Sequence, residues 1–353
     1  MGLVKTQSMR LDLPDDVEEV YAYFEANGFG DGHPVIPPTA ARVERFLDAG
    51  DLSPDTEIAV LEPSKGVATV EKIAINAVMA GCLPAYMDVV IAAVEALASS
   101  PRQSNCMTTA HSLSPLLLVN GPIARELGIA SGAGGSAVSW RANAAIGRAV
   151  RLCLINIAGI PGSTDCNTFM WLPKYMYCIA ENDEANPWES FAVEKGFSPE
   201  DDVVTAFWRE PAHHIEVGWP TTAQELLAAF CDSMCTVACR AAYGESQVLM
   251  GFCPDQAQAC AKAGFSKRDV KRFLFEHARK PLRAYGPKAV PHFKLEWQKF
   301  YTFSPDAMVP MVASTDLIEI IVIGGAGPNS LYFPHGYGPF TRKIARHWRS
   351  SRA

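Results

Sequence analysis

Hydrophobic residues recur along the chain with two different periods, and each period predicts a different kind of element. In residues 15–27, Val17, Val20 and Phe24 return at the spacing of an amphipathic helix. Three prolines exclude a helix from residues 30–39 and favour an extended, stiff segment there. The first fifty residues therefore predict a helical arm with a proline-rich extended segment.

Short apolar runs alternate with longer helical patterns through the rest of the chain. Strands are expected at 58–61, 116–119, 176–180, 203–208, 248–252 and 317–323, and helices at 40–48, 69–82, 85–98, 141–157, 222–243, 255–263 and 266–279. This alternation predicts a helix-rich α/β fold whose mixed, partly parallel sheet is flanked by helices. No sequence repeat is visible, so residues 51–345 are expected to form one large domain behind the 1–50 arm, with 210–220 as the point where it would divide.

Composition narrows the classes of protein that the chain can belong to. Its 353 residues carry 31 Lys and Arg against 38 Asp and Glu, a net charge of −7, which argues against a basic nucleic-acid binder. Hydrophobic residues make up 48%, which is typical of a globular protein. The longest apolar stretch, 73–97, is interrupted by Pro84, Asp88 and Glu95, and the N-terminus lacks the apolar core of a signal peptide. We therefore expect no membrane span, a cytoplasmic location and reduced thiols at most of the ten cysteines.

A glycine-rich loop between a predicted strand and a long predicted helix is the first candidate binding site. The strand runs into Asn120, the loop contains Gly134, and Arg141 and Asn143 open the helix. Amide groups at a helix start attract anions, and glycines let a ligand approach the backbone. The loop predicts a carboxylate or phosphate site; the equally supported alternative is a tight turn that feeds a closely packed helix of small residues.

A second glycine run follows the last apolar strand of the chain. Gly325, Gly327 and Ser330 lie directly beyond residues 317–323. Ligands of open α/β sheets gather beyond the carboxyl ends of strands, so these residues are candidates for substrate binding. A simple chain reversal is the competing interpretation.

Three cysteines share one predicted helix. Cys231, Cys235 and Cys239 are four residues apart, which places their thiols on one stripe of that helix. Such thiolates are suited to a soft transition metal such as Cu(I) or Zn²⁺. The chain contains no Cys-x-x-Cys pair of the kind that closed zinc sites use, so a buried face of small residues is the alternative.

Two other cysteines are candidate nucleophiles. Cys178 lies at the end of a predicted strand, just before Glu181, a candidate general base, and Cys82 closes a predicted helix. Because a helix C-terminus disfavours a thiolate, Cys178 is the better nucleophile. The expected imidazole partner is His111 or the pair at positions 213 and 214.

Charged residues also gather in two long stretches. The acidic stretch covers residues 181–202, and the basic stretch covers residues 267–299. We expect both to be solvated faces, with contact between them across a subunit interface as the alternative.

Five blocks of sequence are long enough to be specific to one family. They are DGHPVIPPT (31–39), TVEKIAINAVMAGC (69–82), WRANAAIGR (140–148), CIAEN (178–182) and GGAG (324–327). Together they resemble a poorly characterised bacterial family associated with small UGSC-motif (seleno)proteins. The resemblance implies a small thiol- or selenol-bearing protein as partner. The blocks point to Glu71, Lys72, Asn76, Cys82, Arg141, Asn143, Cys178 and Glu181, whereas His33 and the three-cysteine stripe depart from the family's pattern.

These observations lead to one main hypothesis about function. It is an enzyme that cleaves, adds to or reduces a carbon–heteroatom bond of a small anionic or polar molecule, using a thiol and a carboxylate. The alternatives are a thiolate metal-binding protein and a non-catalytic subunit of a thiol-bearing partner. A homo-oligomer is expected because apolar helices commonly pack between subunits. The hypothesis requires Glu71, Arg141, Cys178 and Gly325 to lie around one pocket where strands end.

Overall fold

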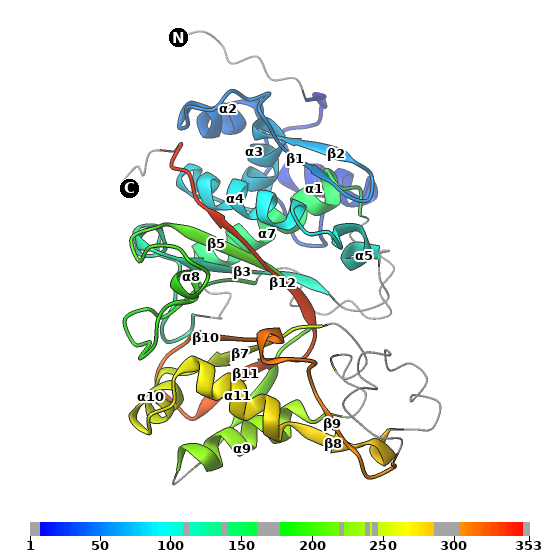
Figure 1. Ribbon diagram of the computed structural model, residues 1–353. Helices are drawn as coiled ribbons and strands as arrows, with labels where there is room; N and C mark the ends of the chain where they lie inside the picture. The colour runs from blue at the N-terminus through cyan, green and yellow to red at the C-terminus, as the bar shows by residue number, and fades with distance from the viewer. Residues whose placement is uncertain are drawn as a thin grey trace.

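Two four-stranded sheets, packed face to face between layers of helices, form the centre of the molecule (Figure 1). The computed structural model describes residues 8–108, 113–135, 140–160, 177–218, 222–236, 241, 246–285 and 304–348. Parallel and antiparallel strand pairs both occur, and helices cover both outer faces. The α/β expectation is therefore confirmed, although the strands divide between two sheets.

The first sheet has the strand order β12–β5–β3–β4. Its strands are β12 (Gly336–Lys343), β5 (Val203–Arg209), β3 (Ser114–Asn120) and β4 (Tyr177–Ala180). The β3–β4 pair is parallel, and the other two pairs are antiparallel. In this register Leu117 lies opposite Cys178 on one side and Ala206 on the other.

The second sheet has the strand order β10–β7–β11–β6. Its strands are β10 (Ile318–Val322), β7 (Val248–Phe252), β11 (Asn329–Phe333) and β6 (His213–Glu216). The β10–β7 pair is parallel, and the other two pairs are antiparallel. Two short ribbons lie outside these sheets: β1 (Glu57–Leu61) with β2 (Gly66–Thr69), and β8 (Arg279–Pro281) with β9 (Met308–Pro310).

The two sheets repeat one topology, although the sequence shows no repeat. In each, a central strand is followed by a helical connection, a parallel neighbour and then an antiparallel strand on its other side. The fourth strands are exchanged: β6 follows β5 in the chain but completes the second sheet, and β12 follows β11 but completes the first. The exchange ties the two halves of the chain together.

Helices from the first half of the chain cover the first sheet. They are α1 (Val17–Ala26), α2 (Ala40–Asp48), α3 (Val70–Met79), α4 (Met87–Ala98), α5 (Gln103–Thr108), α6 (Pro122–Glu126) and α7 (Arg141–Asn156), with a 3₁₀ turn at Pro84–Tyr86. Phe24 of α1 and Phe46 of α2 are buried in the same apolar core as α3, α4 and α7. The structure therefore packs α1 and α2 into the main body of the protein.

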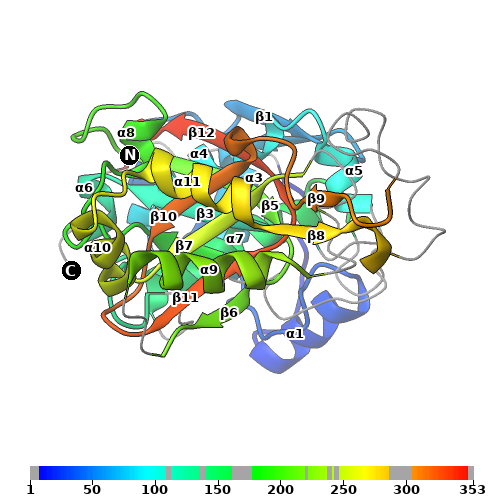
Figure 2. The same cartoon turned by 60° about the horizontal axis from the view of Figure 1, so that its bottom comes forward.

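Helices from the second half cover the outer face of the second sheet (Figure 2). They are α9 (Ala223–Met234), α10 (Pro254–Lys262) and α11 (Lys267–His277); the short α8 (Phe191–Glu194) and 3₁₀ turns at Leu282–Ala284 and Thr315–Leu317 complete the described elements. A capping box of Thr222 and Glu225 begins α9. The expected helix at 222–243 is too long, because α9 ends at Met234. In the described residues no helix has the length and apolar character needed to cross a bilayer.

A third apolar layer lies between the sheets. Alternate residues of each strand point into it, among them Leu118 of β3, Phe207 of β5, Leu249 of β7 and Ile321 of β10. Polar side chains occur on the same faces at both ends of this layer: Asn120 and Glu181 where β3 and β4 end, and Arg209 where β5 ends. Buried polar residues at the ends of an apolar layer are candidates for a functional site.

Candidate functional site

The carboxyl ends of β3, β4 and β10 meet at a buried polar group that we call the strand-end cluster: Asn120, Glu181, Asn143 and the two glycine loops. Glu181 accepts hydrogen bonds from Asn120 Nδ2 (2.7 Å), Phe191 N (2.6 Å), Asn186 Nδ2 (3.1 Å) and Val322 N (3.4 Å). Because these donors come from both sheets and from α8, Glu181 joins three parts of the fold.

The environment of Glu181 changes its proton affinity. The side chain is 3% exposed, and burial raises the pKa of its carboxyl to about 7, while Lys267 and the hydrogen-bond donors oppose that rise. Burial likewise raises the pKa of the neighbouring Asp183. A carboxyl with such a pKa can exchange a proton near neutral pH, but its four donors already hold both oxygens.

Asn143 at the start of α7 fixes the first glycine loop. Its Nδ2 donates to the carbonyls of Gly135 (3.1 Å), Cys178 (2.9 Å) and Ala130 (3.2 Å), and its Oδ1 accepts from Ala130 N (2.9 Å). Gly134 in this loop has φ 73°, a conformation that favours glycine. Here the alternative interpretation of the loop, a tight turn feeding a packed helix, matches the contacts.

The second glycine loop packs directly on the first. Gly324 N donates to Ser131 O (2.8 Å), and a Cβ at Gly325 would lie 2.9 Å from Ala133 Cα. Glycine at 325 is therefore required by close backbone approach. Farther along, Gly327 N donates to Asp255 (3.0 Å), and Ser330 Oγ accepts from Cys253 N (2.9 Å). These contacts anchor the loop to the start of α10.

Both candidate nucleophiles are buried in the helix-facing core of the first sheet. Cys178 is 1% exposed, and burial raises the pKa of its thiol to about 12. Cys82 contacts Ala145 O through Sγ (3.3 Å), and burial raises its pKa even further. Both therefore remain neutral thiols at pH 7, which disfavours nucleophilic attack. The suggested partner His111 lies outside the described residues.

Arg141, which was predicted to hold an anion, and Arg148, two turns further along α7, both bind groups of the protein itself. Arg141 donates from Nε and Nη2 to Gly81 O at the end of α3 (3.1 and 3.0 Å). Arg148 binds the buried carboxylate of Asp31 with Nε and Nη2, at 2.8 Å each. Asp31 belongs to the DGHPVIPPT block, so one function of that block is to fasten the proline-rich segment to α7.

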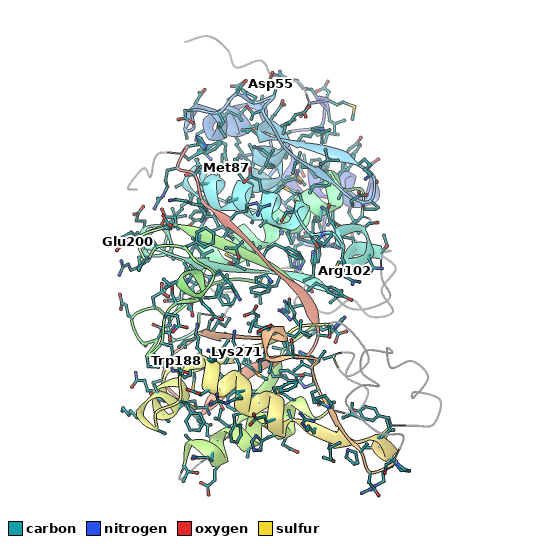
Figure 3. The ribbon with its side chains drawn as sticks, in the orientation of Figure 1. Asp55, Met87, Arg102, Trp188, Glu200 and Lys271 are labelled. Atoms are coloured by element: carbon teal, nitrogen blue, oxygen red, sulfur yellow. The ribbon has the colours of Figure 1, made fainter. Side chains whose placement is uncertain are left out.

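The acidic and basic stretches meet inside a single chain. Lys195 binds Glu319 (2.8 Å), Lys267 binds Glu194 (3.2 Å), and Lys271 contacts both carboxylates. Lys267 is 2% exposed, and Figure 3 shows Lys271 at the boundary between α11 and the second sheet. The expectation of solvated faces fails for Lys267, which is buried in this ion network, but Glu184, Glu189 and Glu200 of the acidic stretch and Arg268 and Arg272 of the basic stretch are exposed as expected.

Two cysteines of the three-cysteine stripe fall within the described residues. Cys231 lies on α9, Cys235 is its C-cap and donates weakly to Arg279 O, and Cys239 lies outside the described residues. Burial raises the pKa of Cys235 to about 11 and of Cys231 to about 12. Within the described ranges, no group of three or more His, Cys, Asp or Glu side chains is arranged to hold a metal ion.

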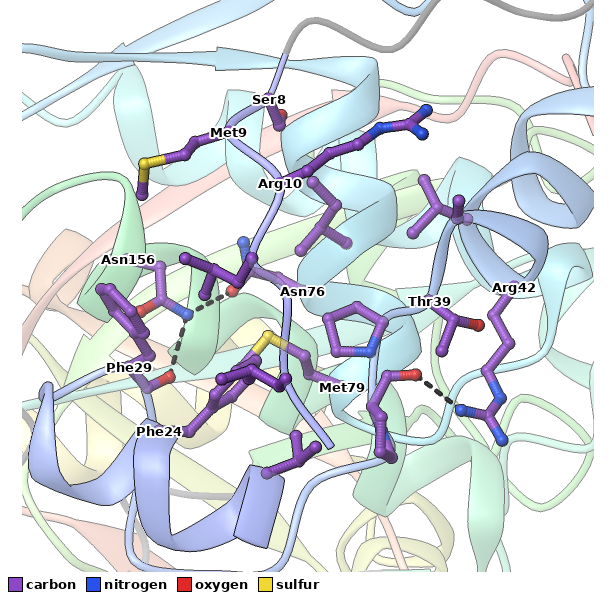
Figure 4. Close-up of a pocket in the computed structure, with 18 of the residues that line it drawn as sticks. Ser8, Met9, Arg10, Phe24, Phe29, Thr39, Arg42, Asn76, Met79 and Asn156 are labelled. Atoms are coloured by element: carbon purple, nitrogen blue, oxygen red, sulfur yellow. Dashed lines mark hydrogen bonds between the residues drawn. The ribbon is translucent and has the colours of Figure 1, made fainter. Parts of the chain in front are cut away.

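A cavity of about 550 Å³ lies between residues 8–17 and the helices of the first half (Figure 4). We call it the arm cavity. Its lining is mainly apolar, with side chains such as Phe24, Ile75 and Met79, and its size is that of a small-molecule site. Pro37, Pro38 and Thr39 of the DGHPVIPPT block and Glu71, Ile75, Asn76 and Met79 of the TVEKIAINAVMAGC block line it together.

Polar groups converge at one part of this cavity. Asn156 donates from Nδ2 to Asn76 Oδ1 (2.7 Å) and to Phe29 O (3.1 Å), while its own Oδ1 is buried without a hydrogen-bond partner (Figure 4). Glu71 is 3% exposed, and its Oε1 accepts a hydrogen bond from Ser8 N (3.0 Å). Asn156 and Glu71 therefore offer acceptors, and Glu71 already holds the segment that covers the cavity; Arg10 and Arg42 also line the cavity and bring donors to it.

The residues predicted for one pocket thus lie in different places. Asn120, Asn143, Glu181 and Gly325 meet in the strand-end cluster. Glu71 and Asn76 line the arm cavity, whereas the Lys72 side chain binds Val67 O (2.8 Å) at the surface. Asn156 was missed, because a lone polar residue at the end of a helical pattern gives no signal in the sequence.

The fold and these sites define a two-sheet α/β protein with a small-molecule cavity beneath its N-terminal segment. No protein-family model matches the sequence, and no curated protein matches it either.

Proposed function

We propose that the arm cavity binds a small, mainly apolar molecule that carries an amine or hydroxyl group, and that Asn156 and Glu71 accept hydrogen bonds from that group. The observation that carries the proposal is a buried carboxylate and an unpartnered amide oxygen, Asn156 Oδ1, in the wall of one apolar cavity. An unpaired acceptor in such a wall favours a ligand with a hydrogen-bond donor.

This proposal keeps the polar substrate and the carboxylate of the sequence-based hypothesis and leaves out its thiol. No cysteine is among the described residues that line the cavity. Glu71 lines the cavity and is a hydrogen-bond acceptor there. Because Glu71 also accepts from Ser8 N, a ligand donor would compete with residues 8–17 for the carboxylate, and binding would loosen that segment.

Three probes with one apolar body test the proposal: 2-naphthylmethylamine, 2-naphthylmethanol and 2-naphthoate, followed by their fluorescence during titration of the protein. The amine and the alcohol are expected to bind, and the carboxylate to bind at least about tenfold more weakly, since its oxygens would face the acceptors of Asn156 and Glu71. Arg10 and Arg42 also line the cavity, so tighter binding of the carboxylate would assign the polar site to them instead.

Two variants locate the site. Asn156→Ala removes the acceptor and should weaken the amine and the alcohol about tenfold, whereas Asn27→Ala, at an exposed asparagine outside the cavity, should not. Tightest binding of 2-naphthoate, or equal affinities in Asn156→Ala and the parent, would contradict the proposal.

A further inference from the structure

Arg209, the last residue of β5, is a fully buried cation between the two sheets. Its side chain is 0% exposed, and its guanidinium carbon lies 4.9 Å from the ring centroid of Phe207, which belongs to the apolar layer between the sheets. Gly336 of β12 packs against it so closely that a Cβ at that position would lie 2.7 Å from Arg209 Cδ. The surrounding backbone therefore fixes the position of the side chain.

Only part of this guanidinium has a partner. Nη1 donates to Gln247 O (2.7 Å), whereas Nε and Nη2 are buried without a hydrogen-bond partner. The hydroxyl of the neighbouring Ser246 and the amide oxygen of Gln247 are also buried and unpartnered. A buried N–H group of a charged side chain left without an acceptor carries a large desolvation cost, so this group of atoms requires an explanation.

The two unpartnered nitrogens form one edge of the guanidinium. Nε and Nη2 together bind two oxygens of a carboxylate or phosphate in a planar fork. Arg148 shows the same fork with a carboxylate bound, because its Nε and Nη2 bind the two oxygens of Asp31 at 2.8 Å each. At Arg209 the same edge has no protein carboxylate on it.

The charges around Arg209 do not supply the missing partner. The carboxylate that acts on it most strongly, Glu319, already binds Lys195 and Lys271. Four cations (Arg209, Lys195, Lys267 and Lys271) share this network with four carboxylates (Glu181, Asp183, Glu194 and Glu319). Burial lowers the pKa of Arg209 to about 9, which leaves it charged at pH 7. The lysines bind Glu194 and Glu319, and amide donors hold Glu181, so none of these carboxylates fills the free edge of Arg209.

We infer that Arg209 binds a small oxyanion, a carboxylate or a phosphate, between the two sheets. Two of its oxygens accept from Nε and Nη2, and the Ser246 hydroxyl is available as a further donor. The anion balances the buried charge and joins β5 of the first sheet to the segment that leads into β7 of the second. This site is separate from the arm cavity and does not depend on the function proposed for it.

Equilibrium urea unfolding of the full chain tests this inference, because a closed site is accessible from the unfolded state. Sodium phosphate, sodium acetate and sodium chloride are compared at equal ionic strength and pH 7. A bound anion stabilises the folded protein in proportion to ln(1 + [anion]/Kd), so phosphate or acetate should raise the midpoint along a binding isotherm, and chloride should not. Phosphate alone would indicate a phosphoryl ligand, and acetate alone a carboxylate.

Variants identify the residue responsible. Arg209→Lys keeps the charge but loses the fork, so the apparent Kd should rise at least about tenfold. Arg342→Gln, at an exposed arginine of β12, should leave the Kd unchanged. If the wild-type protein has the same urea midpoint in all three salts, the inference is overturned, and this result does not depend on whether Arg209→Lys folds. An Arg209→Lys protein that folds and keeps the wild-type Kd would also overturn it.

Discussion

At the scale of single residues, burial determines which ionisable groups can take part in chemistry near neutral pH. Glu181 and Cys178 lie within one short stretch of β4 and the loop after it, yet burial brings the pKa of the first toward neutrality and moves that of the second away from it. Desolvation disfavours the charged form in both cases, so a carboxyl shifts up into the physiological range and a thiol shifts up out of it.

The titration of Glu181 predicts a pH dependence of stability. Its folded pKa of about 7 exceeds the unfolded value of about 4.3, so the folded protein binds the extra proton between these values. Its contribution to the free energy of unfolding is therefore fully present below about pH 4.3 and is lost as the pH rises through 7. Relative to Glu181→Gln, the parent should lose a few kcal/mol over this range, at about 1.4 kcal/mol per pKa unit. Urea unfolding at a series of pH values measures the difference, and parallel profiles for the two proteins would contradict it.

The buried thiols predict low reactivity. With a pKa near 12, Cys178 has about one ten-thousandth of its thiols ionised at pH 8, against about a quarter for a free cysteine. Alkylation of Cys178 by iodoacetamide should therefore be at least about 1,000-fold slower in the native protein than in urea. Peptide mass spectrometry follows each cysteine separately, and native labelling of Cys178 at the unfolded rate would restore it as a candidate nucleophile.

Sequence patterns at this scale identified some residues but not their roles. Asn120, Asn143 and Glu181 were predicted from their places at strand ends and a helix start. In the structure Asn120 binds Glu181, and Asn143 binds the carbonyl of Cys178, three residues before Glu181. Asn156 and Arg209 could not be found in the same way, because their importance comes from missing hydrogen-bond partners. Pairing of this kind depends on tertiary contacts that no local spacing encodes.

At the scale of elements, most helices and strands follow from the hydrophobic period. The helix predicted at 40–48 has the same bounds as α2, and the predicted strand at 248–252 has the same bounds as β7. Strand β12 was missed because Gly338 and Pro339 interrupt its pattern, and β11 because it is a short run between Pro328 and Pro334. Both strands are held by their neighbours in the sheets. The helix predicted at 222–243 is wrong at its C-terminal end. The hydrophobic periodicity of the sequence continues past Met234, but α9 ends at that residue.

The link between the proline-rich segment and α7 is an element-scale prediction. Asp31 is completely buried at its side chain and is bound by Arg148, which also donates to the carbonyls of His33 and Pro34. Asp31→Asn or Arg148→Met alone leaves one charge buried without its partner and should cost about 3–5 kcal/mol. The double variant should cost clearly less than the sum of the two, measured by urea unfolding as a double-mutant cycle. Additive losses would show that the pair does not act as a unit.

At the scale of the whole molecule, the exchanged strands make the two halves depend on each other. Without β12 the first sheet would expose the backbone of β5 along its edge, and without β6 the second sheet would expose that of β11. Such open edges aggregate. The apolar layer between the sheets would also be exposed if either half were alone, which adds a second reason for interdependence.

Cutting the chain tests this dependence. Residues 1–218 contain β6 but lack β12, and residues 222–353 contain β12 but lack β6, so each fragment expressed alone should be insoluble or unfolded. Expressed together they should assemble, because each supplies the strand that the other lacks.

The sharper comparison is between residues 213–353 and residues 222–353. The longer fragment carries all four strands of the second sheet, so it should gain soluble protein and a cooperative thermal transition by circular dichroism over the shorter one. Independent folding of residues 1–218 as a monomer would show that β12 is dispensable to the first sheet, and the exchange would then be a feature of topology without a role in stability.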